Sequence, residues 1–252
     1  MKRALLYVLV FVGIQFLASG VVQGIFILLK GSGSVDATRL IIISALADVI
    51  TLVLFLLLRW AEVSRHWVRT RPWTVLFWCC LAAFGAIIPS TYIQELLPEL
   101  PSHADDEFDM LMGSRLGYFV IALGAPLVEE LVFRGAILRA LLRWKSNPWV
   151  GIIISSVLFA ASHMNPVQMP HAFLVGLLLG WMYYRTDSIV PGVVYHWVNN
   201  TVAYVLYQFY PNADIELIDL FKGNQSSVLM AVAFSLCIFV PALYQLNQRM
   251  SK

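Results

Sequence analysis

The chain has 252 residues, of which 60% are hydrophobic and 13% are charged, and its mean hydropathy is +0.76. Soluble globular proteins average about 45–50% apolar and about 25% charged residues, so this composition excludes a disordered chain and argues against a water-soluble enzyme. The formal net charge of +2 is too small to indicate a nucleic-acid partner. We therefore expect an all-α, multi-pass bundle of membrane helices.

Eight apolar segments have roughly the length that a membrane-spanning helix needs, which is about 20 residues. In chain order they are residues 4–29, 40–58, 73–97, 116–134 (continuing to 142), 148–163, 172–184, 189–210 and 227–244. The first is longer than the core of a signal peptide, roughly 7–15 residues, and is expected to be retained. The sixth crosses only if its helix begins near Pro170, and a re-entrant segment is the alternative. Residues 1–252 are expected to form a single membrane domain.

Basic residues are unevenly distributed over the connecting segments. With the N-terminus inside, the cytoplasmic segments hold Lys2, Arg3, Arg59, Arg65, Arg69, Arg71, Arg139, Arg143, Lys145, Arg185, Arg249 and Lys252, and the outer segments hold Lys30, Arg39, Arg115 and Lys222. This bias is the positive-inside pattern. It predicts an integral multi-pass protein with both termini in the cytoplasm, in the plasma (inner) membrane if the host is bacterial. The acidic stretch 99–109 then lies outside.

Ionisable side chains are also present inside the apolar segments, all but one of them in the C-terminal half. Such groups are costly to bury in hydrocarbon, and they therefore mark functional sites. With a rise of about 1.5 Å per residue, the motif positions fall at compatible depths in the membrane. The ionisable residues are Glu129, Glu130 and Arg134 in the fourth segment, His163 in the fifth and His196 in the seventh, and the motifs also contain Phe159 and the polar Asn200.

The spacing within each segment predicts partners for these groups. Glu130 and Arg134 are four residues apart, hence on one helix face, and we expect a structural ion pair that reduces the cost of burying both charges. Glu129 is rotated by about 100° from Glu130 and needs another partner. His196 and Asn200 are again four residues apart, so both can face one cavity.

Taken together, these side chains point to hydrolysis of an acyl bond. Glu129, beside a histidine in a wet pocket, can act as a general base on water. Pro126 removes a backbone donor and leaves a gap in the helix that can admit water. A histidine and an asparagine on one face can donate hydrogen bonds to an oxyanion. The sequence has no Gly-x-Ser-x-Gly nucleophile, and Cys79, Cys80 and Cys237 lie outside these segments.

The three motifs resemble those of a known family. Glu-Glu-x-x-x-Arg at 129–134, Phe-x-x-x-His at 159–163 and His-x-x-x-Asn at 196–200 resemble, in this order, the motifs of the CPBP intramembrane proteases. That family includes the type II CAAX prenyl endopeptidases and the bacterial Abi or bacteriocin-immunity proteins. The resemblance covers residues 116–204, and residues 1–115 are expected to be N-terminal membrane helices.

The resemblance implies an intramembrane endopeptidase that acts on a membrane-associated peptide, such as a prenylated CAAX-like peptide or a leader peptide. The family has been described both as metal-dependent and as glutamic, and we expect no cofactor, with zinc as the alternative. The resemblance also implies that Glu129 and His163 activate the attacking water. It further implies that His196 and Asn200 stabilise the tetrahedral oxyanion. The residues that support the site are then Glu130, Arg134 and Phe159.

Other interpretations stay open at this point. Glu129, His163 and His196 could bind zinc in an intramembrane metallopeptidase, although no His-Glu-x-x-His motif accompanies them. The same groups could relay protons in a transporter, or the chain could be a catalytically silent immunity protein. His163 could be an interfacial residue, and His196 and Asn200 could simply tie helices together. Asp48 matches no motif and is either a polar contact or a residue of a substrate channel.

Overall fold

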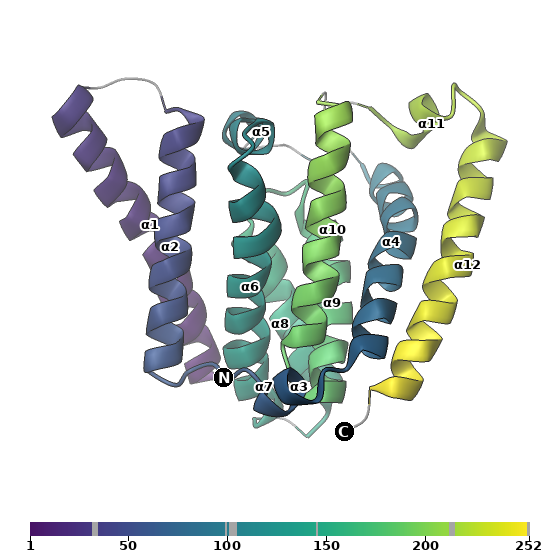
Figure 1. Cartoon of the computed structure of the whole chain (residues 1–252), viewed down its shortest axis with the longest axis horizontal. Helices are drawn as coiled ribbons and strands as arrows, with labels where there is room; N and C mark the ends of the chain where they lie inside the picture. The colour runs from purple at the N-terminus through teal and green to yellow at the C-terminus, as the bar shows by residue number, and fades with distance from the viewer. Residues whose placement is uncertain (32–34, 99, 101–104, 145, 212–214, 251–252) are drawn as a thin grey trace.

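The structure is a computed structural model of the whole chain, and it describes residues 1–31, 35–98, 100, 105–144, 146–211 and 215–250. Within these residues every element is helical, which confirms the predicted all-α fold. The long helices stand side by side, and both chain ends lie at the same end of the bundle (Figure 1). Three residues of the predicted charge pattern, Glu99, Lys145 and Lys252, lie outside the described residues.

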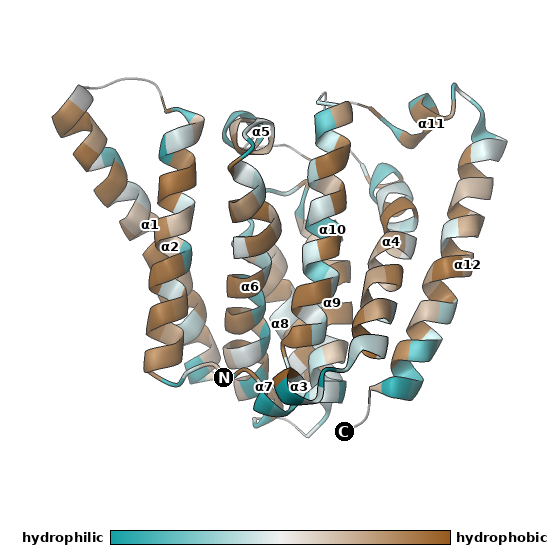
Figure 2. Ribbon diagram, viewed as in Figure 1, coloured by the Kyte–Doolittle hydropathy of each residue, from teal (hydrophilic) through white to brown (hydrophobic). Residues whose placement is uncertain are grey.

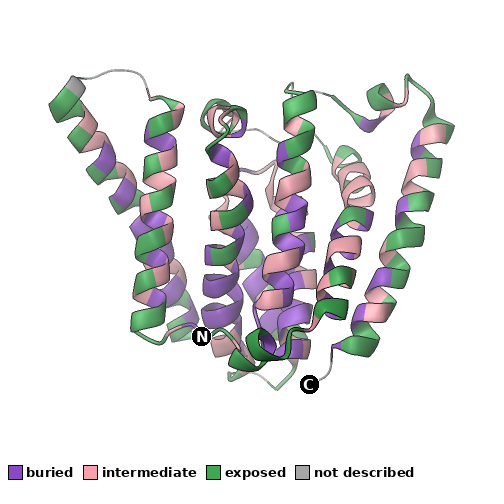
Figure 3. Ribbon diagram, viewed as in Figure 1, coloured by how far each residue is buried: buried purple, intermediate pink, exposed green. Residues whose placement is uncertain are grey.

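Four helices of the described chain are long and apolar enough to cross a membrane. They are α1 (Lys2–Lys30), α2 (Ala37–Leu57), α4 (Trp73–Glu95) and α12 (Gln225–Arg249). Their hydrophobic residues extend onto exposed faces (Figures 2 and 3). On α1, for example, Leu9 is 71% exposed and Phe16 is 62% exposed. Apolar faces of this size fit contact with lipid, and the four helices indicate an integral membrane protein.

The other four apolar segments are helical as well. The bounds are η1 (Phe119–Gly124), α6 (Ala125–Glu129), η2 (Glu130–Leu138) and α7 (Arg139–Leu142), which follow one another without interruption, then α8 (Pro148–Ser162), α9 (Met169–Thr186) and α10 (Val190–Phe209). Helix α9 has 18 residues and carries Pro170 in its first turn, so the early start that its length requires is confirmed. Short helices in the connections are α3 (Arg65–Thr70), α5 (Asp105–Gly113) and α11 (Leu217–Leu220).

The helical rod from η1 to α7 departs from α-helical geometry in two places. The segments η1 and η2 are π-helical, a geometry with hydrogen bonds between residues five apart that is rare and often found at functional sites. At the end of η1, the N–H of Ala125 donates to the carbonyl of Val120. In the same register the carbonyl of Ile121 would need a donor from Pro126, which has no N–H. The backbone gap expected from Pro126 therefore falls at the Ile121 carbonyl.

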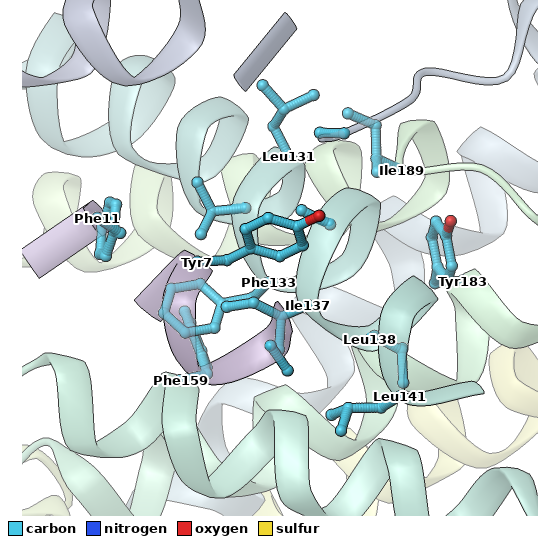
Figure 4. Close-up of a cluster of buried hydrophobic side chains, with 14 of the residues drawn as sticks. Tyr7, Phe11, Leu131, Phe133, Ile137, Leu138, Leu141, Phe159, Tyr183 and Ile189 are labelled. Atoms are coloured by element: carbon cyan, nitrogen blue, oxygen red, sulfur yellow. The ribbon is translucent and has the colours of Figure 1, made fainter. Parts of the chain in front are cut away.

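The main hydrophobic core surrounds η2, all of whose residues are buried. Phe133 lies between Phe11 of α1 and Phe159 of α8, with ring centroids 5.5 Å and 5.2 Å away. Tyr7 of α1 and Tyr183 of α9 belong to the same cluster (Figure 4). A helix enclosed by protein on every side has no lipid-facing surface, so it can carry charged side chains that an outer helix cannot.

The connections differ in charge between the two ends of the bundle. Helices α3 and α7, the start of α1 and the end of α12 lie at the end that holds both termini, whereas α5 and α11 lie at the opposite end (Figure 1). The first group carries the basic residues Lys2, Arg3, Arg65, Arg69, Arg139 and Arg249, and the second carries the acidic residues Asp106, Glu107, Asp109 and Asp219. Basic and acidic segments are thus separated along the helix axes, as the charge pattern predicts.

Candidate active site

A cavity of about 570 Å³ lies among α1, α2, the η1–α6 rod, α8, α9 and α10. The residues that line it include Glu129, His163, His196, Asn200 and Phe159. The structure therefore brings the four candidate catalytic side chains, from three separate helical segments, to one hollow. Among the described residues that line this cavity there is no lysine or arginine.

The expected ion pair between Glu130 and Arg134 is present next to this cavity. Arg134 Nη1 lies 2.6 Å from Glu130 Oε1, and the two side chains are 1% and 0% exposed. Arg134 Nη2 also donates to the carbonyl of Gly176, at 3.2 Å. The guanidinium stacks over the ring of Phe159, with Cζ 4.4 Å from the centroid. Arg134 thus ties η2 to α8 and α9, and Phe159 both lines the cavity and supports the arginine.

His196 lies between two carboxylates, an arrangement that the sequence did not predict. Its Nδ1 is 3.3 Å from Glu130 Oε1, and its Nε2 is 3.7 Å from Glu129 Oε2. Gly192, one turn earlier on α10, permits this approach, because a Cβ atom there would lie 2.6 Å from Glu130 Oε2. Glu130 is therefore more than the partner of Arg134, since it also holds the imidazole of His196.

Glu129 and His163 both line the cavity, and their joint activation of a water molecule stays a prediction. The imidazole that forms an ion-pair contact with Glu129 among the described residues is that of His196, with Nε2 3.7 Å from Glu129 Oε2. His163 Nδ1 lies 2.9 Å from the carbonyl oxygen of Phe159. Because a carbonyl oxygen only accepts, Nδ1 carries a proton in this contact, and Nε2 lies outside the hydrogen bond.

Asn200 closes the backbone gap that Pro126 creates. Its Nδ2 donates to the carbonyl of Ile121 at 3.0 Å, and its Oδ1 accepts from Nδ2 of Asn199 at 3.3 Å. The amide of a neighbouring helix thus supplies a donor to the carbonyl that Pro126 leaves without one, and entry of water at this gap stays a prediction. The contact fixes the amide group and leaves the second N–H of its nitrogen outside this hydrogen bond.

The cavity wall also contains polar residues that the motifs did not single out. Asp48 reaches it from α2, next to Gly124, where a Cβ atom would lie 2.6 Å from Asp48 Oδ2. This position fits both interpretations of Asp48, as a polar contact and as a residue of a substrate channel. His171 was missed because the sixth segment was expected to begin at residue 172, whereas α9 begins at Met169. Further polar residues of the wall are Gln15, Ser44, Gln94, Ser162, Gln168 and Asn199.

The side chains proposed as zinc ligands in the alternative interpretation are Glu129, His163 and His196. In the part of the chain that the structure describes, no group of three or more His, Cys, Asp or Glu side chains is arranged to hold a metal ion. One imidazole nitrogen of His196 also faces Glu130, which Arg134 already neutralises. These residues therefore do not fit a zinc site as placed, and their chemistry is that of acids, bases and hydrogen-bond donors.

Comparison with known proteins identifies the region that contains these motifs. Residues 112–202 match the family described as type II CAAX prenyl endopeptidase Rce1-like, which confirms the resemblance. A protein of Escherichia coli described as an uncharacterized 24.3 kDa protein is 34% identical over 85 residues, which make up 32% of this chain. The matched stretch spans 39% of the length of that relative. No solved structure matches the chain.

Proposed function

We propose that this chain, whose residues 112–202 form an Rce1-like domain of the type II CAAX prenyl endopeptidase family, is an intramembrane endopeptidase that uses an activated water molecule. The observation that carries the proposal is the convergence of Glu129, His163, His196 and Asn200 on one cavity inside a membrane protein. The substrate class is a membrane-associated peptide, either a prenylated CAAX-like peptide or a leader peptide.

Glu129 is the proposed general base. Its side chain is 21% exposed and lines the cavity. Its Oε2 lies 3.7 Å from His196 Nε2, beyond hydrogen-bond length, so the carboxylate is free to accept a proton from a water molecule. A general base must lie within reach of the proton that it takes, and a carboxylate that lines the cavity meets this condition.

In the proposed reaction, Glu129 takes a proton from water while the water oxygen bonds to the carbonyl carbon of the peptide. The carbonyl π electrons move to the oxygen and produce a tetrahedral oxyanion. When the oxyanion collapses, the carbon–nitrogen bond breaks and the leaving amine receives the proton from Glu129. His163, whose Nδ1 is held by the carbonyl of Phe159, assists by orienting the water through Nε2, which accepts a hydrogen bond when the ring is neutral.

His196 and Asn200 are the proposed oxyanion donors. Glu130 holds His196 at Nδ1, and Arg134 holds Glu130, so the imidazole is fixed through a chain of buried contacts. With both ring nitrogens protonated, His196 offers Nε2–H to the oxyanion. Asn200 offers its second N–H, and its bond to Ile121 fixes the amide in advance. Donors that are held in place before the reaction stabilise the transition state most effectively.

The proposed topology has eight membrane spans: α1, α2, α4, the η1–α7 rod, α8, α9, α10 and α12. Residues 1–252 then form one membrane domain with both termini in the cytoplasm. The separation of basic and acidic connections between the two ends of the bundle supports this orientation. In a variant without Cys79, Cys80 and Cys237, an impermeant thiol reagent should label a cysteine at Lys222 from outside and leave one at Arg69 unlabelled.

The proposed activity is tested with purified protein in lipid nanodiscs and quenched fluorogenic peptides, both prenylated and unprenylated, together with a leader-type peptide. Glu129→Gln preserves the size of the side chain and removes the base, so turnover should fall by about 100-fold or more. His163→Ala should lower turnover as well. Glu107→Gln on α5, outside the cavity, is the matched control and should cleave like the wild type. Wild-type turnover in Glu129→Gln would overturn the general-base assignment.

The alternative functions predict different outcomes in the same preparation. A zinc metallopeptidase would contain one stoichiometric zinc ion, lose it in His163→Ala, and lose turnover with a chelator. A proton-coupled transporter would cleave nothing and would acidify the lumen of proteoliposomes when solute is added. A catalytically silent immunity protein would do neither of these.

A further inference from the structure

A second cavity, of about 740 Å³, lies at the end of the bundle that holds both termini. It is formed by the start of α1, the residues after α2, and the junction of η2 with α7. None of the described residues that line it also lines the active-site cavity. The basic side chains in its wall are Lys2, Arg3, Arg59, Arg139 and Arg143.

The charge of this cavity is almost wholly positive. Its described lining contains five basic residues and no aspartate or glutamate. Glu62 lies outside the lining and forms a 2.6 Å ion pair with Arg139, so it offsets one of these charges. Basic groups that three separate chain segments bring together in one concave wall repel one another, and an anionic ligand would relieve that repulsion.

The same cavity has an apolar side. Leu6 of α1 and Leu58, which follows α2, line it and are about half exposed. Trp60 and Trp144 complete the wall, and tryptophan is enriched where a membrane meets water. With α1 and α2 spanning the bilayer, Leu6 and Leu58 face acyl chains while the basic residues lie at the level of the lipid headgroups.

We infer that this cavity binds the headgroup phosphate of an anionic phospholipid, whose acyl chains pass over Leu6 and Leu58. Guanidinium groups match phosphate in charge and hydrogen-bonding geometry, and basic pockets between membrane helices bind anionic headgroups. The apolar side favours a lipid over free phosphate, because phosphate alone would gain nothing from it. The inference rests on the proposed membrane topology and does not depend on peptidase activity.

The site also has a structural connection to the active centre. Ala136 and Arg139 of the cavity wall belong to the helical rod that carries Glu130 and Arg134. A bound lipid would link the cytoplasmic end of this rod to α1 and to the segment after α2. Anionic phospholipid should therefore raise the thermal stability of the protein.

The test measures lipid binding to detergent-purified, full-length protein by native mass spectrometry and by thermal unfolding. Phosphatidylglycerol should bind and raise the melting temperature, and phosphatidylcholine should do so much less. Arg59→Gln and Arg143→Gln should each lower the affinity for phosphatidylglycerol about fivefold, since one basic group contributes roughly a factor of five. Arg59→Lys keeps the charge and should retain most of the binding.

The matched control removes the same charge from the same end of the bundle. Arg65→Gln and Arg69→Gln on α3 are exposed and lie outside the cavity, so they should leave phosphatidylglycerol affinity unchanged. Equal losses in the cavity and control variants would overturn the site in favour of general surface charge. Equal binding of the two lipids would also overturn it. Displacement of phosphatidylglycerol by an equal concentration of inorganic phosphate would overturn the assignment of a lipid, because it would show that the cavity binds any phosphate anion.

Discussion

The helical rod from η1 to α7 and the N-terminal helices α1 and α2 differ in how much of their surface can contact lipid. Helices α1 and α2 expose apolar side chains along their outer faces and bury only a narrow stripe. The η2 segment is buried on every side and contains a glutamate and an arginine. The outer helices shield the inner one from lipid, and that shielding is what allows charged groups and irregular backbone to persist at membrane depth.

One residue of the outer helices carries an acidic group into the interior of the bundle. Asp48 belongs to α2, outside the region that matches the peptidase family, yet its carboxylate reaches the active-site cavity beside Gly124. The N-terminal helices therefore do more than enclose the family domain, since they also supply part of the wall of its cavity.

Arg134→Ala should strongly destabilise the protein, because it leaves the carboxylate of Glu130 buried without its arginine. We expect a loss of about 3–5 kcal/mol, measured as the free energy of unfolding in mixed micelles. The double variant Arg134→Met with Glu130→Gln removes both charges and should be more stable than Arg134→Ala. Equal free energies of unfolding in the two variants would mean that Arg134 does not stabilise the buried carboxylate of Glu130.

Gly192→Ala should come next, because a new Cβ atom would collide with Glu130 Oε2 and push α10 away from η2. We expect a loss of about 1–3 kcal/mol together with weakened turnover, as His196 moves away from Glu130. Gly13→Ala on α1 is the control, since a Cβ atom there meets nothing within 4 Å. That change should be neutral or should raise the free energy of unfolding by about 0.5–1 kcal/mol. A lower stability in Gly13→Ala would mean that this face of α1 is as closely packed as the inner helices.

Asn200→Ala should cost about 0.5–1.5 kcal/mol, since it removes the donor to the part-buried carbonyl of Ile121. Adding Pro126→Ala restores a backbone N–H in the register where Ile121 needs one. The double variant should regain stability but not turnover if Asn200 also serves the oxyanion. Recovery of both properties would limit Asn200 to closing the backbone gap.

Leu9→Ala should have the smallest effect, because this side chain is exposed on the lipid-facing side of α1. We expect the free energy of unfolding to change by no more than about 0.5 kcal/mol. Phe133→Ala, in the core around η2, is the matched inner variant and should lose about 3–5 kcal/mol. Similar losses in both would mean that α1 is packed against protein on its outer face.

The lengths of the hydrophobic runs and the spacing of residues within single helices made much of the fold and part of the site predictable. Hydrophobic run length placed α10 within one residue at each end, at Val190–Phe209 against the predicted 189–210. The spacing of four residues between Glu130 and Arg134 identified their ion pair. His171 was missed because its helix begins earlier than the apolar run suggested, and the first turn of a helix depends on its cap and its proline rather than on hydropathy.

The amino-acid sequence alone determined that the chain is a membrane bundle, and it supplied the three motifs that identify the family domain. These properties depend on composition and on spacing within single helices, where geometry is nearly fixed. Only the tertiary structure decided that His196 sits between two carboxylates and that Asn200 completes the backbone at Ile121. Such contacts depend on how closely helices distant in the chain approach and how they are rotated, and that is decided by packing at residues such as Gly192.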